Sequence, residues 1–243
     1  MHVHLPKPLH GWREFLHEVA IIVLGVLIAL GLEQIASASH DRASASETRA
    51  TIRGEIAENL RLMLRRQRTD GCVVRRLDEI AAFLDSSSQG QHPAQPTWIG
   101  APYAPLVGET AFKSAQSAGK FFLLPQSEQQ KIEVFYTDGG DFNEQNTREW
   151  YDWAQLRSLA SSSARLTDGE ITRLRQALQD ARGADRLIRE DTSEYIQLAR
   201  HEGIVAHDHA VTDEQLAPAC LPINMSHELA ASKLRRKELG ALE

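Results

Sequence analysis

One apolar segment near the N-terminus constrains this chain more than any other feature of its sequence. From Val19 to Leu32 every residue is apolar or small, in the run VAIIVLGVLIALGL. At about 1.5 Å per residue, a helix over residues 15–36 is about 33 Å long, which matches the hydrocarbon core of a bilayer. Because the segment is apolar on all faces, a buried core helix explains it poorly. We therefore predict a membrane-spanning helix over residues 15–36, surrounded by lipid.

Four residues of this predicted span are candidates for contacts within the membrane. Glu18 and Glu33 lie near its ends, where a carboxylate either reaches the interface or pairs with a polar group on another membrane helix. Gly25 and Ala29 form a small-xxx-small pair, which permits close approach of a second helix. Gly25, Ala29, Glu18 and Glu33 are therefore our candidate contact residues.

A cleavable signal peptide is the competing interpretation of the same segment. The N-terminus is positively charged, and Ala36-Ser37-Ala38 fits a cleavage site made of small residues. Cleavage after Ala38 would release a soluble protein that begins near Ser39. We favour a retained anchor, because Glu33 and Gln34 suit a cleavage region poorly.

Orientation rests on weaker signals, since basic residues lie on both sides of the apolar segment. The signal-like N-terminus favours export of the long C-terminal part. We therefore predict that residues 1–14 are a cytoplasmic tail and that residues 37–243 form a periplasmic domain at a bacterial inner membrane. The two cysteines, Cys72 and Cys220, are either buried thiols or one disulfide in that oxidising compartment.

The part after the anchor is expected to be all-α. Residues that favour helix dominate its composition, and β-branched runs are scarce. Ser44 and Glu47 fit a capping box at the start of a long helix. A heptad seam follows, with a polar gap at Gln67 and Asp70 that coincides with Gly71 and predicts a kink there. The seam comprises Ile56, Leu60, Met63, Gln67, Asp70, Val74, Leu77, Ala81 and Leu84.

Turn-forming residues divide the remainder into shorter helices. Residues 86–106 are rich in Ser, Gln, Gly and Pro and predict an irregular crossing loop. Pro125 begins a helix that is expected to end near Thr137, before a turn at Asp138-Gly139-Gly140-Asp141. Further helices are expected at 109–118, at 143–162, from the Thr167–Glu170 capping box to about His201, and from Ser226.

Two of these helices are long and carry matching seams, so we expect an antiparallel helical bundle with two long helices. In such a bundle Cys72 lies in the first long helix, and Cys220 packs against it from the C-terminal segment. A disulfide between them is one of the two alternatives for this pair.

The anchor also carries a family resemblance. Residues 18–30, EVAIIVLGVLIAL, resemble the membrane helix E-[IV]-x-[IL]-[IV]-x-[IL]-G-[IV]-L-I-A-L of a family of uncharacterised bacterial single-pass membrane proteins. A looser similarity covers Thr110-Ala111-Phe112, Ser117-Ala118-Gly119, Leu123-Leu124 and Phe135-Tyr136, and the C-terminal third is not clearly covered. The resemblance implies this topology and no catalytic residues.

Three clusters are candidate sites, each with a structural alternative. His201, Glu202, His207, Asp208 and His209 offer zinc or copper ligands, although their spacing matches no established motif and a solvated loop explains them as well. The arginines of the first long helix form a charged outer face, pair with acidic residues of other helices, or form a docking face for an anionic partner. Trp150, Tyr151 and Trp153 either pack inside the domain or form a ligand or partner surface.

Several function classes are disfavoured. The net charge of −6 argues against a nucleic-acid partner. GxSxG, P-loop and GxGxxG motifs are absent from the sequence, and we expect no cofactor. Our leading hypothesis is a membrane-tethered, non-enzymatic helical module that binds a membrane or periplasmic protein, or itself. An extracytoplasmic ligand or signal sensor is the alternative, followed by a metal-dependent enzyme using the His201–His209 region.

Overall fold

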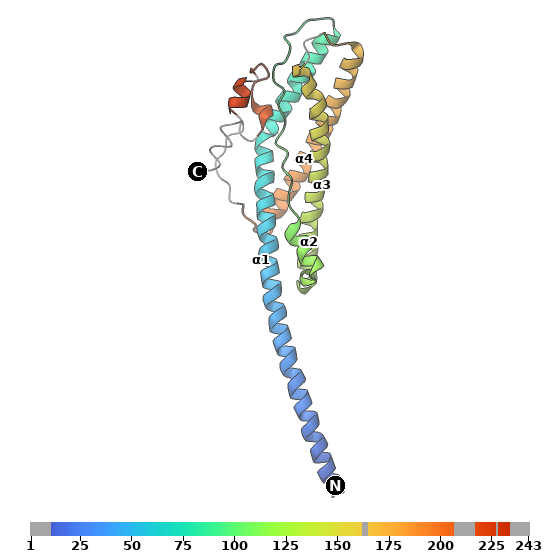
Figure 1. Cartoon of the computed structure of the whole chain (residues 1–243), viewed down its shortest axis with the longest axis vertical. Helices are drawn as coiled ribbons and strands as arrows, with labels where there is room; N and C mark the ends of the chain where they lie inside the picture. Colours follow the sequence, from blue (N-terminus) through green and yellow to red (C-terminus); the bar gives the residue numbers. More distant parts are fainter. Residues whose placement is uncertain (1–10, 162–164, 207–216, 227, 234–243) are drawn as a thin grey trace, which may run out of the picture.

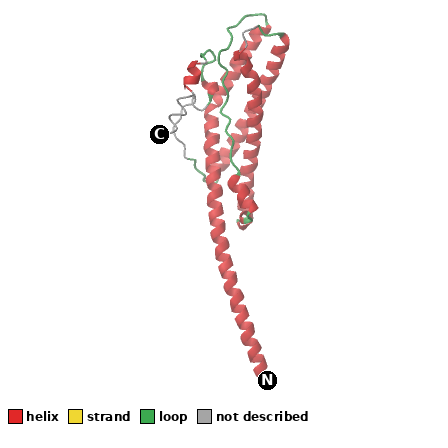
Figure 2. Ribbon diagram, in the orientation of Figure 1, coloured by secondary structure: helices red, strands yellow, loops and turns green. Residues whose placement is uncertain are grey.

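The computed structural model describes residues 11–161, 165–206, 217–226 and 228–233, and within these ranges the chain is helical and contains no strand (Figures 1 and 2). Short turns of 310 helix and a last helical stretch at 228–233 join or follow four α-helices. The helices are α1 (Trp12–Ser88), α2 (Thr110–Ser117), η1 (Lys120–Leu123), α3 (Gln126–Leu156), η2 (Arg157–Ser161), α4 (Asp168–His201) and η3 (Pro218–Cys220).

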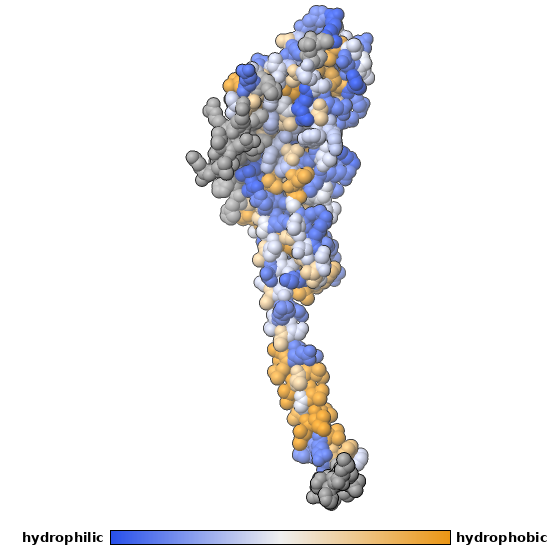
Figure 3. All heavy atoms as spheres, viewed as in Figure 1, coloured by the Kyte–Doolittle hydropathy of each residue, from blue (hydrophilic) through white to orange (hydrophobic). Residues whose placement is uncertain are grey.

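α1 is one helix of 77 residues, and its N-terminal part projects alone from the rest of the molecule (Figure 1). Its apolar segment is fully exposed and forms the hydrophobic band near the end of the rod in Figure 3. By length and composition, α1 is able to cross a membrane. The expected helix start at a Ser44 cap is wrong, because α1 begins at Trp12, and a break at Gly71 is also wrong, because α1 is continuous there.

The other helices gather around the C-terminal half of α1, and we call the described residues from 44 onward the head. α4 packs along both α1 and α3 and runs antiparallel to them (Figure 1). One apolar cluster, around Ile56 and Phe135, lies nearer the projecting rod, and a second, around Leu77 and Trp153, lies at the far end. The expectation of two long helices is therefore incomplete, because α3 is a third.

The segment between α1 and α2 packs as an extended fourth element of the head. Asn59 exchanges two hydrogen bonds with the backbone of Gly108, both 2.8 Å long. Asn143 exchanges two with Val107, of 2.9 and 3.0 Å, and Asn146 donates one to Pro105 O. These amides hold the expected crossing loop against α1 and α3, and each of them satisfies backbone groups that have no helical partner.

The ends of two helices follow their local sequence signals, whereas one expected turn does not form. Thr167 and Glu170 make the predicted reciprocal capping box of α4, and Gly119 adopts a positive φ of 71° directly after the end of α2. The expected turn at residues 138–141 is wrong, because α3 is helical throughout. Gly139 is buried, and a Cβ there would lie 3.2 Å from Val107 Cγ2, so its small size serves packing against the crossing loop.

Candidate functional site

A layer of polar side chains separates the two apolar clusters of the head. Arg66 of α1 donates from Nη2 to Glu149 Oε1 of α3, at 3.0 Å, and to Asp185 Oδ1 of α4, at 2.9 Å. All three side chains are 2% exposed or less. A buried arginine between two carboxylates ties three helices together at one level, and we call this group, together with Asp70, the polar layer.

The polar layer is only partly satisfied by protein groups. Among the described residues, Arg66 Nε and Nη1, Glu149 Oε2 and Asp70 Oδ1 are buried and have no hydrogen-bond partner. Burial raises the pKa of Glu149 to about 7, although Arg66 opposes the shift. Burial also raises the pKa of Asp70 to about 6, with Arg66 again lowering it and Asp185 raising it. Both carboxyls therefore favour their protonated forms more than they do in an unfolded chain.

These shifts predict that the head is more stable in mild acid than at alkaline pH. A carboxyl with a raised folded-state pKa stabilises the fold below its unfolded pKa and loses this contribution as the pH rises through the folded value. For Glu149 the window runs from about 4.5 to about 7. We expect the free energy of unfolding to fall by about 2 kcal/mol between pH 5 and pH 8.

Urea denaturation of the detergent-solubilised protein across this pH range measures the effect. The matched variant is Glu149→Gln, which cannot titrate and should flatten most of the dependence. A wild-type profile that rises from pH 5 to pH 8 contradicts the prediction.

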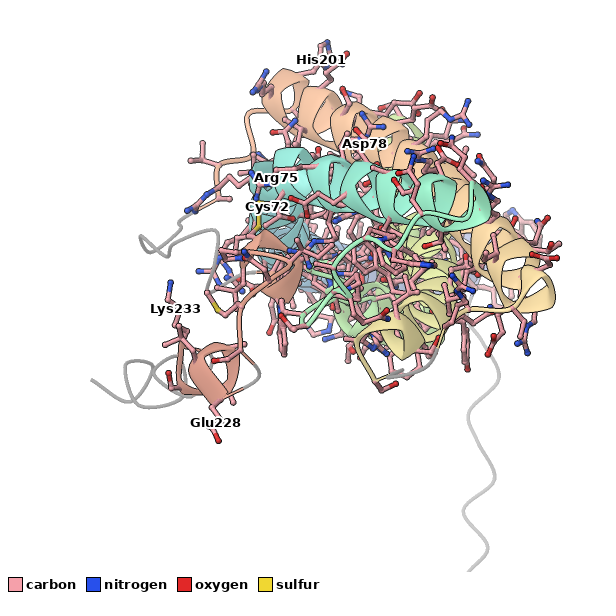
Figure 4. All side chains as sticks on the ribbon, turned by 90° about the horizontal axis from the view of Figure 1, so that it is seen from above. Cys72, Arg75, Asp78, His201, Glu228 and Lys233 are labelled. Atoms are coloured by element: carbon pink, nitrogen blue, oxygen red, sulfur yellow. A yellow bond between two sulfur atoms is a disulfide. The ribbon has the colours of Figure 1, made fainter. Side chains whose placement is uncertain are left out.

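A second buried arginine fastens the C-terminal segment to α1. Arg76, 1% exposed, donates to the carbonyl oxygens of Trp98, at 2.9 Å, and also to those of Ile99 and Leu221. Beside it the sulfurs of Cys72 and Cys220 are bonded at 2.02 Å, and Arg75 reaches Cys220 O (Figure 4). We call residues 97–101 and 217–223, with their contacts to α1, the clasp.

The two segments of the clasp are also joined to each other by direct hydrogen bonds. Ala219 N donates to Ala101 O at 2.8 Å, and Trp98 N donates to Ile223 O at 2.9 Å. Trp98 Nε1 donates to Pro218 O at 2.9 Å. Two segments that lie more than a hundred residues apart in the sequence thus form one connected surface at the side of α1.

At Gly100 the backbone of one clasp segment lies very close to the backbone of Pro218 in the other. The φ of Gly100 is +75°, and a Cβ there would lie 2.4 Å from Pro218 O. We expect Gly100→Ala to lower the free energy of unfolding by about 2–4 kcal/mol, from the left-handed backbone and the steric overlap together. Gly90→Ala is the matched control, because Gly90 has the same φ with nothing within 4 Å. Equal losses in urea denaturation for the two variants would contradict this account.

An apolar hollow of about 500 Å³ opens beside the clasp. Trp98, Ile99 and Pro218 of the clasp line one side, and Trp150 and Arg157 from the end of α3 and the start of η2 line the other. The guanidinium carbon of Arg157 lies 5.6 Å from the centre of the Trp150 ring, which is a cation–π geometry. Trp150 is 51% exposed, and it also lines a smaller hollow of about 210 Å³ together with Leu106 and Tyr151.

The expected aromatic cluster is therefore divided by the structure. Trp153 is fully buried in the second apolar cluster, whereas Trp150 and Tyr151 stay exposed with their rings 5.5 Å apart. Packing inside the domain is right for Trp153 and wrong for Trp150.

The metal-site prediction falls largely outside the described residues, since His207, Asp208 and His209 are not among them. His201 projects at the edge of the head (Figure 4), with Nδ1 3.0 Å from Glu202 Oε1, and Glu202 also pairs with Lys131 at 2.8 Å. The described residues contain no group of three His, Cys, Asp or Glu arranged to hold a metal. A metal at His201–His209 stays a prediction.

The four membrane-contact candidates all lie on the exposed surface of α1. Their spacing places them on one face of the helix, because Gly25, Ala29 and Glu33 follow Glu18 at seven, eleven and fifteen residues. A Cβ at Gly25 would meet nothing within 4 Å. This face is open to a second helix, and its contact role remains a prediction.

The arginines of α1 divide between the alternatives that the sequence offered. Pairing with acidic residues of other helices is confirmed for Arg66, which contacts Glu149 of α3 and Asp185 of α4. A charged outer face is wrong for Arg66 and Arg76, because both are buried and hold the polar layer and the clasp. A signal for their burial exists, since both fall at three-four spacing with buried Met63, Val73 and Ile80.

Comparisons of the chain with protein-family models, curated proteins and solved structures return no match.

Proposed function

We propose that this chain is a single-pass membrane protein whose helical head binds another protein outside the cytoplasm. The observation that carries the proposal is the continuity of α1, in which an exposed apolar segment and a buried, heavily packed segment belong to the same helix. An apolar surface of this size is unstable in water and finds its partner in lipid. α1 would then present the head at a fixed distance from the bilayer.

The disulfide supports a periplasmic head at a bacterial inner membrane, with the N-terminus in the cytoplasm. Disulfides persist in oxidising compartments and are rare where thiols are kept reduced. Cys72 lies about 36 residues beyond Ala36, or about 54 Å along α1, so the bond belongs to the side of the membrane that holds the head. Export of the head is the orientation that fits this bond.

The buried polar groups of the head support the binding of a protein rather than chemistry on a small substrate, because their contacts are made within the chain. The buried arginines hold helices and loops together, and each donates to groups of the chain itself. The exposed side chains Leu106, Trp150 and Tyr151, in contrast, line one hollow together. Contiguous apolar patches of this kind mark sites of macromolecular contact.

Crosslinking in membranes, followed by affinity purification and quantitative mass spectrometry, tests the proposal. The matched control is Arg66→Ala, which keeps the apolar part of α1 and disrupts the head. We expect one or a few proteins to be recovered at least about tenfold more with the wild type than with equal amounts of the control. Identical sets of recovered proteins contradict a binding role for the head.

A further inference from the structure

We propose that the groove beside Trp150 is the docking site for a partner protein, and that it receives an apolar side chain with an adjacent Asp or Glu. This inference rests on the proposed function and names the surface and the partner chemistry. The groove comprises the two neighbouring hollows that share Trp150, the larger lined also by Trp98 and Arg157 and the smaller by Tyr151 and Leu106.

The groove is built in advance of any partner. Its clasp side is held by Arg76 and by the hydrogen bonds of Trp98 to Pro218 and Ile223, and the Cys72–Cys220 bond closes the same segment onto α1. Its other side is the end of α3. There Trp153 and Leu156, which neighbour Trp150 and Arg157 in the sequence, are fully buried in the head. A rigid surface loses little conformational entropy on binding, which favours affinity.

Its residue types are those of a protein interface. Tryptophan, tyrosine and arginine dominate the energetics of protein–protein contacts, and the groove presents all three. Tyr151 is 62% exposed and Leu106 is 68% exposed, so both leave water only if a partner covers them. Each large apolar side chain that is covered contributes about 1.5–3 kcal/mol.

The charge at the groove specifies an acidic partner. Arg157 stacks on Trp150, and among the described residues no carboxylate lies within ion-pair distance of it. A partner carboxylate next to an inserted apolar side chain meets this guanidinium at the rim of an apolar surface, where a charge-assisted hydrogen bond is stronger than in open water.

The position of the groove excludes the lipid surface as its occupant. Arg76, which holds the clasp side, lies 40 residues beyond Ala36 on the same helix, or about 60 Å along its axis. The polar headgroup region adds only about 5–8 Å to each side of the hydrocarbon core. Residues 15–36 in a bilayer therefore leave the groove well outside the reach of lipids.

Site-specific photocrosslinking in native membranes tests the inference with the full-length protein. A photoreactive phenylalanine derivative replaces Tyr151 in the groove or, as the matched control, Phe122 of η1, which is 66% exposed outside it. We expect a discrete protein adduct from position 151 and none from position 122. Mapping of the crosslinked peptide should place an Asp or Glu within a few residues of the attachment point.

Charge variants at the rim separate the groove from a nonspecific contact. We expect Arg157→Glu to reduce the adduct at least about tenfold, whereas Arg157→Lys retains a substantial part of it. Arg148→Glu is the control in α3, because Arg148 pairs with Glu144 and does not line the groove, so this change should leave the yield unchanged. Circular dichroism of each variant verifies that the head stays folded.

The outcomes distinguish this inference from the proposed function. A protein adduct at position 122 without one at position 151 overturns the groove and leaves the proposed function standing. A lipid or small-molecule adduct at position 151, a crosslinked peptide that is basic, or insensitivity to Arg157→Glu also overturns the groove. Absence of protein adducts from both positions, together with identical recovery by wild type and Arg66→Ala, contradicts both.

Discussion

Replacement of Arg66 by alanine should unfold the head more effectively than any other single substitution of a charged residue. The change leaves Glu149 and Asp185 buried against each other without the guanidinium that neutralises them. Removing one partner of a buried ion pair costs about 3–5 kcal/mol, a large share of the 5–15 kcal/mol that stabilises a typical domain. We expect the melting temperature, followed by circular dichroism, to fall by about 10 °C or more.

Two variants show that the effect comes from the uncompensated charges. Arg182→Ala removes an exposed pair with Asp78, and we expect a loss below about 1 kcal/mol. The triple variant Arg66→Met/Glu149→Leu/Asp185→Leu removes the three fully buried charged side chains of the polar layer. We expect it to recover most of the stability that Arg66→Ala loses. If Arg66→Ala melts together with Arg182→Ala, the polar layer does not hold the helices in the way described.

Removal of the disulfide should be the second large effect. The bond joins Cys72 to a residue 148 positions away, and the chain-entropy model assigns a loop of this length about 5 kcal/mol. Measured losses are commonly smaller, so we expect Cys72→Ser/Cys220→Ser to lower the free energy of unfolding by about 2–4 kcal/mol. Without the bond, the C-terminal segment of the clasp keeps its hydrogen bonds from Arg75 and Arg76 of α1 but loses its covalent attachment.

Reduction of the wild-type protein provides the matching control. Dithiothreitol should lower the wild-type melting temperature to that of the double variant and leave the variant unchanged, because the described residues contain no free cysteine. Reduced protein should also become sensitive to proteolysis within residues 217–223. A melting temperature that reduction does not change contradicts a structural role for the bond.

Long periodic segments and caps made part of this fold predictable from sequence. Thr167 and Glu170 begin α4, and Gly119 follows α2, because both signals act through hydrogen bonds or backbone angles of adjacent residues. The apolar segment could be identified as a candidate membrane span for a similar reason, since that prediction depends on its composition and length alone.

The predicted seam of α1 is confirmed for most of its apolar residues, which are buried: Ile56, Leu60, Met63, Leu77 and Leu84. It is wrong for Gln67 and Val74, which are exposed, and it omitted the buried Arg66 and Arg76. An arginine is buried in a core only where carboxylates or carbonyl oxygens accept its hydrogen bonds. For Arg66 and Arg76 those acceptors come from α3, α4 and the clasp. Information from other elements decided the register.

Gly139 and the groove illustrate the same limit. Two adjacent glycines and two aspartates favour a turn locally, yet packing of Gly139 against Val107 keeps α3 continuous. Trp98 and Pro218 lie together only because the clasp joins distant segments, so no local sequence pattern predicts the groove.

We propose that residues 15–36 anchor the mature protein in a membrane, and intact-mass measurement of the protein purified from carbonate-washed membranes tests this anchor. We expect the chain to resist the wash and its mass to include residues 15–36. Recovery in the soluble fraction as a chain that begins near Ser39 would contradict it.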